Sequence, residues 1–212
     1  MPAISGSAMI ALWNGVDPAR QAEYDVWHSR EHVPERIGVP GMIGARRYLR
    51  TAGPLPRYLT LYDIEDISVL ASAPYQRLLA EPTPWTLSMR PSFRGFMRLC
   101  CRREFSAGGG MGGVLGAIML AEPPAEPRST LTALLAKPGV TTVHLLLRDP
   151  TVADVPFTIG GDAPDFPRGG AILLEGFDEA GLASAAESLT IYRLAYAVDR
   201  EDLGRLVPPA QS

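Results

Sequence analysis

The chain has 212 residues, a length typical of one large domain or of two domains with about 100 residues each. Its content of 46% hydrophobic and 20% charged residues excludes a disordered, collagen-like or coiled-coil chain. The net charge is only −3, the basic residues form no continuous stripe, and glycines interrupt the longest nearly uncharged stretch. We therefore expect neither a nucleic-acid nor a membrane partner.

The first half of the chain predicts alternating strands and helices. Asp17 and Pro18 provide an N-cap and a first-turn proline for a long helix, and Pro40 and Gly41 stop it. Prolines break the stretch Glu81–Arg94, which predicts either a lid or a segment that wraps the end of the fold. In chain order the predicted elements are a strand at Ala8–Asn14, a helix from Asp17 to about Ile37, strands at Met42–Arg50 and Arg57–Ile64, a helix at Asp66–Ala80 and a strand at Phe93–Phe105.

A glycine-rich segment at 107–113 follows the first half. Five of the six residues 108–113 are glycine, which predicts a flexible linker. A phosphate-binding loop is the sharper alternative, but no Lys-Ser or Lys-Thr pair follows the glycines. We therefore expect two units, 1–106 and 114–205, joined by this linker.

The second half repeats the order of the first. The predicted elements are strands at Val114–Leu120, Val140–Arg148, Ala171–Phe177 and Ile191–Asp199, with helices at Pro127–Ala136 and Asp178–Ser188. The order β-α-β-β-α-β, read twice, predicts two tandem ferredoxin-like repeats in an α+β fold. Two such sheets facing each other would close into a barrel, an intramolecular pseudo-dimer. The chain itself would then be a monomer or a homodimer.

The two cysteines, Cys100 and Cys101, are adjacent on a predicted strand. Neighbours on a strand point to opposite faces, and a disulfide between them would need strained geometry. The apolar run Ala8–Trp13 has no basic segment before it, so we expect no secretory signal. These features predict reduced thiols in a cytoplasmic protein.

One segment concentrates titratable and aromatic residues. His28 and His32 are four residues apart and share one face of a helix, with Glu31 between them. A zinc site is one interpretation, but the only other histidine is His144 and the order His-Glu-x-x-His is absent. A second interpretation is that the histidines only cap the helix end, where a charged imidazole is favoured. The third is a general acid or base at a pocket mouth, with a pKa near neutrality.

The run Tyr24-x2-Trp27-x4-His32-x-Pro34-x5-Pro40-Gly41, followed by Arg47-Tyr48, resembles the EthD family of the dimeric α+β barrel superfamily. The resemblance is specific over Tyr24–Tyr48 and covers only the order of elements elsewhere. It implies a barrel with a pocket between sheet and helices. The superfamily includes cofactor-free isomerases, decarboxylases and dehydratases, haem-using enzymes and proteins without known activity.

The resemblance implies a cofactor-free enzyme that moves protons on a small apolar cyclic or aromatic-derived carbonyl compound, by isomerisation, decarboxylation or dehydration. His32 matches the proton-shuttling position of the lactone-isomerase-like members, with His28 and Glu31 expected to set its charge. The residues expected to bind the substrate are Tyr24, Trp27, Tyr48 and Arg46, and no metal or cofactor is expected. The alternatives are a non-catalytic binding or structural barrel, and a haem-binding barrel with an axial histidine.

The second half lacks the chemical groups of the first. Aligning Pro138-Gly139 on Pro40-Gly41 places Thr130 opposite His32 and Ala125 opposite Trp27. We therefore expect one active pocket per chain. The same alignment places His144 opposite Arg46, and either side chain could face inward or pack against helices.

Overall fold

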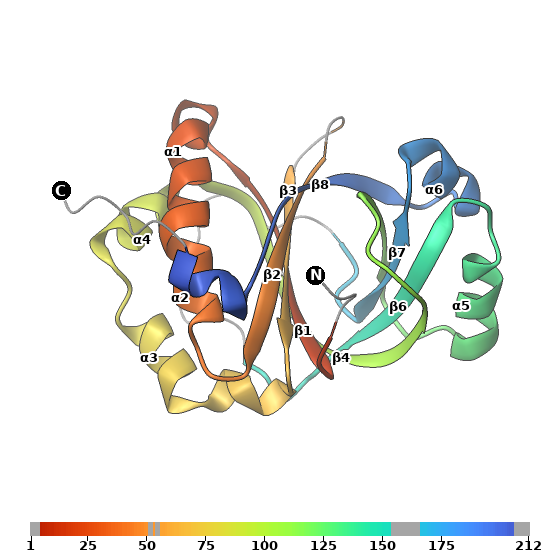
Figure 1. Cartoon of the computed structure of the whole chain (residues 1–212), viewed down its shortest axis with the longest axis horizontal. Coiled ribbons are helices and arrows are strands. Elements are labelled where there is room, and N and C mark those ends of the chain that lie inside the picture. The colour runs from red at the N-terminus through yellow and green to blue at the C-terminus, as the bar shows by residue number, and fades with distance from the viewer. Residues whose placement is uncertain (1–4, 51–52, 54–55, 154–165, 206–212) are drawn as a thin grey trace.

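The computed structural model describes residues 5–50, 53, 56–153 and 166–205. Eight antiparallel strands close into a barrel in the order β1-β3-β2-β8-β5-β7-β6-β4 (Figure 1). The strands are β1 (Ala8–Val16), β2 (Met42–Leu49), β3 (Tyr58–Ile64), β4 (Phe93–Gly108), β5 (Val114–Leu120), β6 (Val140–Arg148), β7 (Gly170–Gly176) and β8 (Thr190–Asp199). The mixed α+β class and the barrel are thus confirmed.

Helices cover the barrel on two sides. Those between β1 and β4 lie on one side, and α5 and α6 lie on the other (Figure 1). The helical segments are η1 (Pro18–Arg20), α1 (Gln21–Trp27), η2 (His28–His32), α2 (Val33–Ile37), η3 (Ile67–Ala71), α3 (Ala73–Ala80), α4 (Pro84–Met89), η4 (Arg90–Ser92), α5 (Pro127–Leu135), α6 (Glu179–Ala185) and η5 (Arg200–Arg205). No helix among the described residues is long and apolar enough to cross a membrane.

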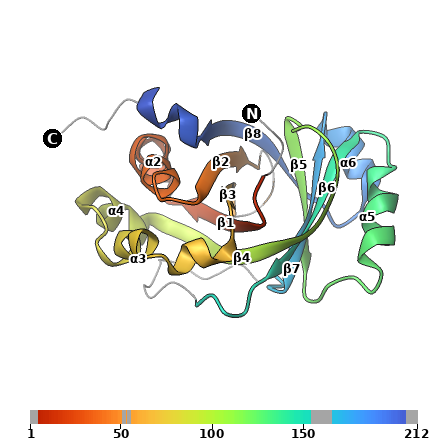
Figure 2. The same cartoon turned by 60° about the horizontal axis from the view of Figure 1, so that its bottom comes forward.

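Each half has the same internal strand order. The first half runs β4-β1-β3-β2 and the second runs β8-β5-β7-β6. The halves meet where β2 pairs with β8 and where β4 pairs with β6. Figure 2 shows the long β4 and β8 crossing between the two sides of the molecule.

Local signals explain where the helices begin and end. The Asp17 carboxylate accepts a hydrogen bond from the backbone N–H of Ala19, and Pro18 occupies the first helical position. Ser72 caps α3 in the same way, and it divides the predicted helix 66–80 into η3 and α3. Gly41 has φ of +86°, and a Cβ at this position would overlap the Val69 side chain. The chain can therefore turn into β2 only with glycine there.

Two segments differ from the sequence prediction. The proline-broken stretch contains a regular helix, α4, whose N-cap Thr83 accepts a hydrogen bond from the backbone N–H of Thr86. The predicted linker is shorter than expected, because β4 continues to Gly108 and pairs there with Thr142 of β6.

Side chains of alternate parity face the two surfaces of the barrel wall. The interior is filled mainly by apolar residues, among them Met9, Trp13, Leu61, Leu99 and Leu173. The residues that alternate with these along each strand point outward and pack against the helices. Cys101 belongs to the interior cluster and Cys100 to the helix-facing cluster, as predicted for neighbours on a strand.

A buried charged cluster lies inside the barrel and connects the two halves. Arg46 Nη1 donates to Glu175 Oε1 at 2.8 Å, and Arg46 Nη2 lies 3.3 Å from Asp63 Oδ2. The backbone N–H of Gly112 donates to the other oxygen of Glu175 at 2.8 Å. Burial raises the pKa of Asp63 to about 6. Burial also lowers the pKa of His144, whose Nδ1 lies 2.7 Å from Ser106 Oγ, to about 3, so this ring is neutral at pH 7.

Candidate active site

The helix that carries the two histidines contains one π-helical turn, η2, at His28–His32. The backbone N–H of Val33 donates to the carbonyl of His28, five residues earlier. Pro34 has no N–H to continue the α-helical ladder, and the wider turn accommodates this gap. Pro34 does not end the helix, which continues through α2 to Ile37. Such π turns occur often at functional sites.

A cavity of about 70 Å³ lies between this helix, α3, α4 and the outer faces of β1, β3 and β4. Most of its wall is apolar or aromatic, and no Asp or Glu is among its described lining residues. The wall is formed by Ile10, Leu12, Asn14, Tyr24, Trp27, His28, His32, Arg36, Thr60, Tyr62, Tyr75, Leu79, Thr86, Arg90, Phe93, Phe96 and Arg98. The structure therefore brings together four of the predicted site residues: Tyr24, Trp27, His28 and His32.

The two imidazoles lie side by side in the wall, with ring centroids 5.6 Å apart. His28 is buried and its Nε2 lies 3.2 Å from Thr60 Oγ1, so β3 fixes the orientation of this ring. The Nδ1 atoms of both rings are buried and have no hydrogen-bond partner among the described residues. His28 is thus held by the sheet, whereas the His32 ring packs on Trp27, with a centroid distance of 4.4 Å.

Burial lowers the pKa of His28 and of His32 well below the ordinary value of 6.5. Nearby guanidinium groups, above all Arg47 for His28 and Arg36 for His32, add to the effect. Both rings are therefore neutral at pH 7, which differs from the expected pKa near neutrality. A neutral imidazole inside the helix does not serve as a charged cap, so the capping interpretation loses its basis.

Trp27 and Tyr24 form the aromatic part of the wall. Their ring centroids lie 5.6 Å apart, and the Tyr24 hydroxyl donates to the side-chain oxygen of Asn14 at 3.2 Å. Trp27 is buried, and its indole N–H donates to Glu31 Oε1 at 3.1 Å. These contacts fix both rings in the cavity wall.

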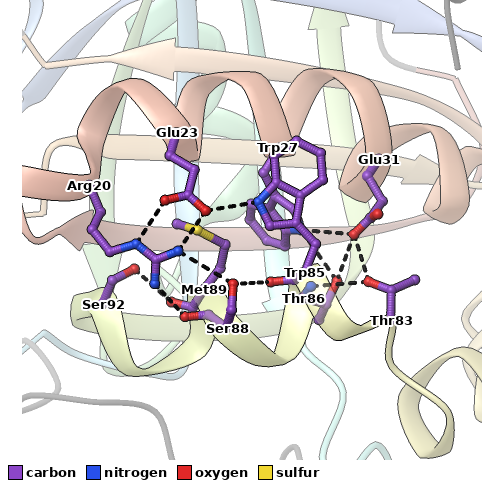
Figure 3. A network of polar contacts seen from close by, with 10 residues as sticks. All are labelled: Arg20, Glu23, Trp27, Glu31, Thr83, Trp85, Thr86, Ser88, Met89 and Ser92. Carbon is purple, nitrogen blue, oxygen red and sulfur yellow. Dashed lines mark hydrogen bonds and ion pairs between the residues drawn. The ribbon is translucent and has the colours of Figure 1, made fainter. Parts of the chain in front are cut away.

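Glu31 does not fill the role that we expected for it. It is not among the lining residues, and the charges that act on His32 are Arg36, His28 and Arg90. Glu31 Oε1 instead accepts a hydrogen bond from the Thr83 hydroxyl at 2.6 Å (Figure 3). Glu31 therefore joins the histidine helix to the start of α4.

A second carboxylate, Glu23, holds the other end of α4 against the same helix. It accepts a hydrogen bond from the Trp85 indole at 3.0 Å and forms a two-point ion pair with Arg20 (Figure 3). Arg20 Nη1 also donates to the backbone carbonyl of Ser88 at 2.6 Å. Because Thr86 and Met89 of α4 are buried beneath these contacts, α4 closes this side of the cavity. Three residues of the segment 81–94, Thr86, Arg90 and Phe93, line the cavity.

Arg46 and Tyr48 do not line this cavity. Both are alternate residues of β2 whose side chains face the barrel interior. There Arg46 Nη1 lies 3.4 Å from the Tyr48 hydroxyl. The neighbouring Arg47 faces the helices instead, stacked over the Tyr58 ring and paired with Asp25. The structure thus separates these two residues from the other predicted site residues by the thickness of the sheet.

The sequence analysis did not select several residues that line the cavity. Arg36 follows His32 by four residues on the same helix, a spacing that could have identified it. Thr60 and Tyr62 share one face of β3, but only the barrel shows which face this is. Arg90 and Arg98 come from η4 and β4. Among the described residues no group of three His, Cys, Asp or Glu side chains could hold a metal ion.

No family model and no curated protein matches the chain. Solved structures with the same fold do match it. An anthrone oxidase-like protein aligns with 100% of this chain and 99% of its own, at 9% identity and a TM-score of 0.57. A candidate monooxygenase from Fusobacterium nucleatum aligns with 92% of this chain and 95% of its own, at 7% identity and a TM-score of 0.53. A candidate chlorite dismutase aligns with 96% and 100%, at 13% identity and a TM-score of 0.52.

These neighbours share the α+β barrel fold of this chain. The recognition that the segment Tyr24–Tyr48 suggested is therefore confirmed at the level of the fold. At such low identities the likeness concerns the fold and leaves the chemistry to the residues of this chain.

Proposed function

We propose that the chain is a cofactor-independent enzyme that transfers protons on a small carbonyl compound. The observation that carries the proposal is a pair of neutral imidazoles, the buried His28 and the partly buried His32, in the wall of a cavity lined mostly by apolar and aromatic side chains. Perturbed titratable groups inside a cavity are a recurring feature of active sites. The fold neighbours are barrel proteins with enzyme-like descriptions, which agrees with this class only in general terms.

In the proposed reaction His32 acts as the base. It takes a proton from the carbon next to the substrate carbonyl, which leaves an enolate and an imidazolium. Return of the proton to another carbon completes an isomerisation. Loss of a β-hydroxyl group as water gives a dehydration, and loss of CO2 from a β-keto acid, followed by protonation of the enolate, gives a decarboxylation. His28, held by Thr60, supports His32 and is not itself the base.

The volume of the cavity limits the substrate. A cavity of about 150 Å³ can hold benzene, whereas this one measures about 70 Å³. A cyclic substrate would therefore enter only when side chains such as Phe96 and Arg98 turn away from the cavity. The haem alternative fits poorly, because a macrocycle is far larger than the space that His28 and His32 face.

We further propose that the chain is a fusion of two ferredoxin-like repeats, 1–106 and 114–205, that form an intramolecular pseudo-dimer. The strand order, the same in both halves, supports this proposal. The positions opposite His32 and Trp27, Thr130 and Ala125, carry no base and no ring, which supports one active site per chain. The pair of free cysteines agrees with a cytoplasmic location.

The test is proton exchange in D2O. A panel of small lactones and cyclic ketones is incubated with the protein, and deuterium incorporation is followed by NMR together with oxygen uptake. We expect His32→Ala to lower the exchange rate by a factor of about 10² to 10⁴, and His28→Ala to lower it less. His144→Asn is the matched control, because this histidine lies inside the barrel and away from the cavity.

Each pattern has a distinct meaning. Exchange that persists in His32→Ala but disappears in His28→Ala would refute the assignment of the base. Binding of panel members with no exchange and no oxygen uptake would favour the non-catalytic alternative. A Soret band in the purified protein would favour the haem alternative.

A further inference from the structure

The wall of the cavity contains a buried guanidinium, that of Arg36, whose charge is poorly balanced by nearby carboxylates. Arg36 is only 9% exposed, and the one carboxylate contact of its side chain is with Glu35 at 3.5 Å. That distance is at the outer limit of a hydrogen bond, and adjacent residues on a helix do not face each other. A buried charge without a close partner is costly. The side chain therefore lies in a place that favours an anion.

A hydrogen-bond donor without a partner lies close to this guanidinium. The Tyr62 hydroxyl is buried and has no hydrogen-bond partner among the described residues. Arg36 is the charged group that acts most strongly on it. A buried hydroxyl left unpaired costs free energy that a ligand oxygen would recover.

A second guanidinium, that of Arg90, lines the same cavity. Arg90 comes from η4 and lines the cavity, and Arg36 repels it electrostatically, which adds to the effect of burial in lowering the pKa of Arg90. Two like charges are thus directed at one cavity whose described wall contains no carboxylate. A negative ligand between them would neutralise this repulsion.

We propose that the cavity binds a small carboxylate or enolate anion, held by the Arg36 guanidinium and the Tyr62 hydroxyl, with Arg90 also in the cavity wall. This inference rests on the proposed function, for which it supplies the substrate class: a carbonyl compound that is, or becomes, an anion. The same groups would stabilise the enolate that His32 generates, since charge-assisted hydrogen bonds to an anion are about twice as strong as neutral ones.

The test compares two probes of equal shape and different charge, crotonate and crotonamide. Binding is measured by ligand-observed NMR titration and by the shift in melting temperature. We expect the wild-type protein to prefer crotonate by at least about tenfold, the value of one hydrogen bond to a charged group. Tyr62→Phe should remove most of this preference, and Arg36→Met should abolish it.

Tyr192→Phe is the matched control, because it removes a buried hydroxyl from the barrel interior, outside the cavity. It should leave the preference for crotonate unchanged. If Arg36→Met fails to fold, the Tyr62→Phe comparison alone decides the matter. Equal affinity for both probes, no binding of crotonate, or an unchanged preference in Tyr62→Phe would each overturn the proposal.

The result can be separated from that of the proton-exchange test. His32→Ala should keep the preference for crotonate, because His32 is not part of the proposed anion contact. Preference for crotonate without proton exchange would uphold the anion site and refute the enzyme. Proton exchange without a preference for crotonate would uphold the enzyme and refute the anion site.

Discussion

The carboxyl group of Asp63 makes the stability of the barrel depend on pH in a direction opposite to the usual one. In the unfolded chain this group has its ordinary pKa of 3.8, whereas burial raises the pKa to about 6 in the folded protein, against the opposing effect of Arg46. Between these two values the folded protein binds a proton that the unfolded chain has released. The free energy of unfolding therefore falls as the pH rises through this window, and it changes little above about pH 7.

The size of the effect follows from the two pKa values. One pKa unit corresponds to about 1.4 kcal/mol, so Asp63 contributes a loss of about 3 kcal/mol over the whole window. About 2 kcal/mol of this loss falls between pH 4.5 and pH 7. The Asp63→Asn variant has no titrating group here, and its amide oxygen can still accept a hydrogen bond from Arg46. We expect the wild-type protein, relative to this variant, to lose about 2 kcal/mol between pH 4.5 and pH 7.

Urea unfolding at the two pH values measures this quantity. The pKa of Glu175 is also raised by burial and acts in the same direction, so the double variant Asp63→Asn/Glu175→Gln compared with Glu175→Gln isolates the part that belongs to Asp63. Asp66→Asn is a useful contrast, because hydrogen bonds from Ser68 lower the pKa of Asp66. Its substitution should cost nearly the same stability at pH 7 and at pH 4.5, because both values lie above the ordinary pKa of 3.8. Parallel pH profiles of the wild-type protein and Asp63→Asn would refute the reasoning.

Two further predictions concern the elements around the cavity. Gly41→Ala should lower the free energy of unfolding by about 1 to 3 kcal/mol, because φ is +86° and Val69 occupies the space of the new methyl group; Gly109→Ala, where no atom lies within 4 Å of the added Cβ, should change it by less than about 0.5 kcal/mol in the same urea titration. Thr83→Ala removes the N-cap of α4 and the hydrogen bond to Glu31, so it should cost about 1 kcal/mol and speed hydrogen exchange in α4, and unchanged exchange there would contradict the cap assignment.

Most of the fold could be predicted because its signals are local. The strand β5 and the strand β6 begin and end where the sequence predicted, and the long first helix ends at Ile37 before Pro40 and Gly41. Helix α4 was missed for the opposite reason. Its prolines suggested an irregular segment, yet Pro84 occupies its first turn, where a missing N–H costs nothing.

The candidate site could be predicted only where it lies on one helix. The spacing of Tyr24, Trp27, His28 and His32 placed them together, and the structure brings all four to the cavity. The π turn was not expected. Pro34 lies just after this turn, but a proline can end, kink or widen a helix, and packing against the sheet decides among these outcomes.

Arg46 and Tyr48 were wrongly predicted to lie with the other site residues because the sequence does not show which face of β2 points into the barrel. Where one face of a sheet is exposed, alternating polarity reveals which side chains point to the core. In this barrel every residue of β3 is buried, and on β2 the two neighbouring arginines, Arg46 and Arg47, are both buried on opposite faces. Polarity therefore could not distinguish the two faces of these strands.

The partner that settles the position of Arg46 is remote in sequence. Its carboxylate partner Glu175 lies 129 residues away, on a strand of the other half. That pair forms only when the two halves close the barrel, so no local pattern can indicate it. Arg36 is the contrasting case, because it lies one helical turn after His32 and its position follows from helix geometry alone. Arg46, which was expected to bind the substrate, thus connects the two halves, whereas Arg36, which helix spacing would have selected, lines the cavity.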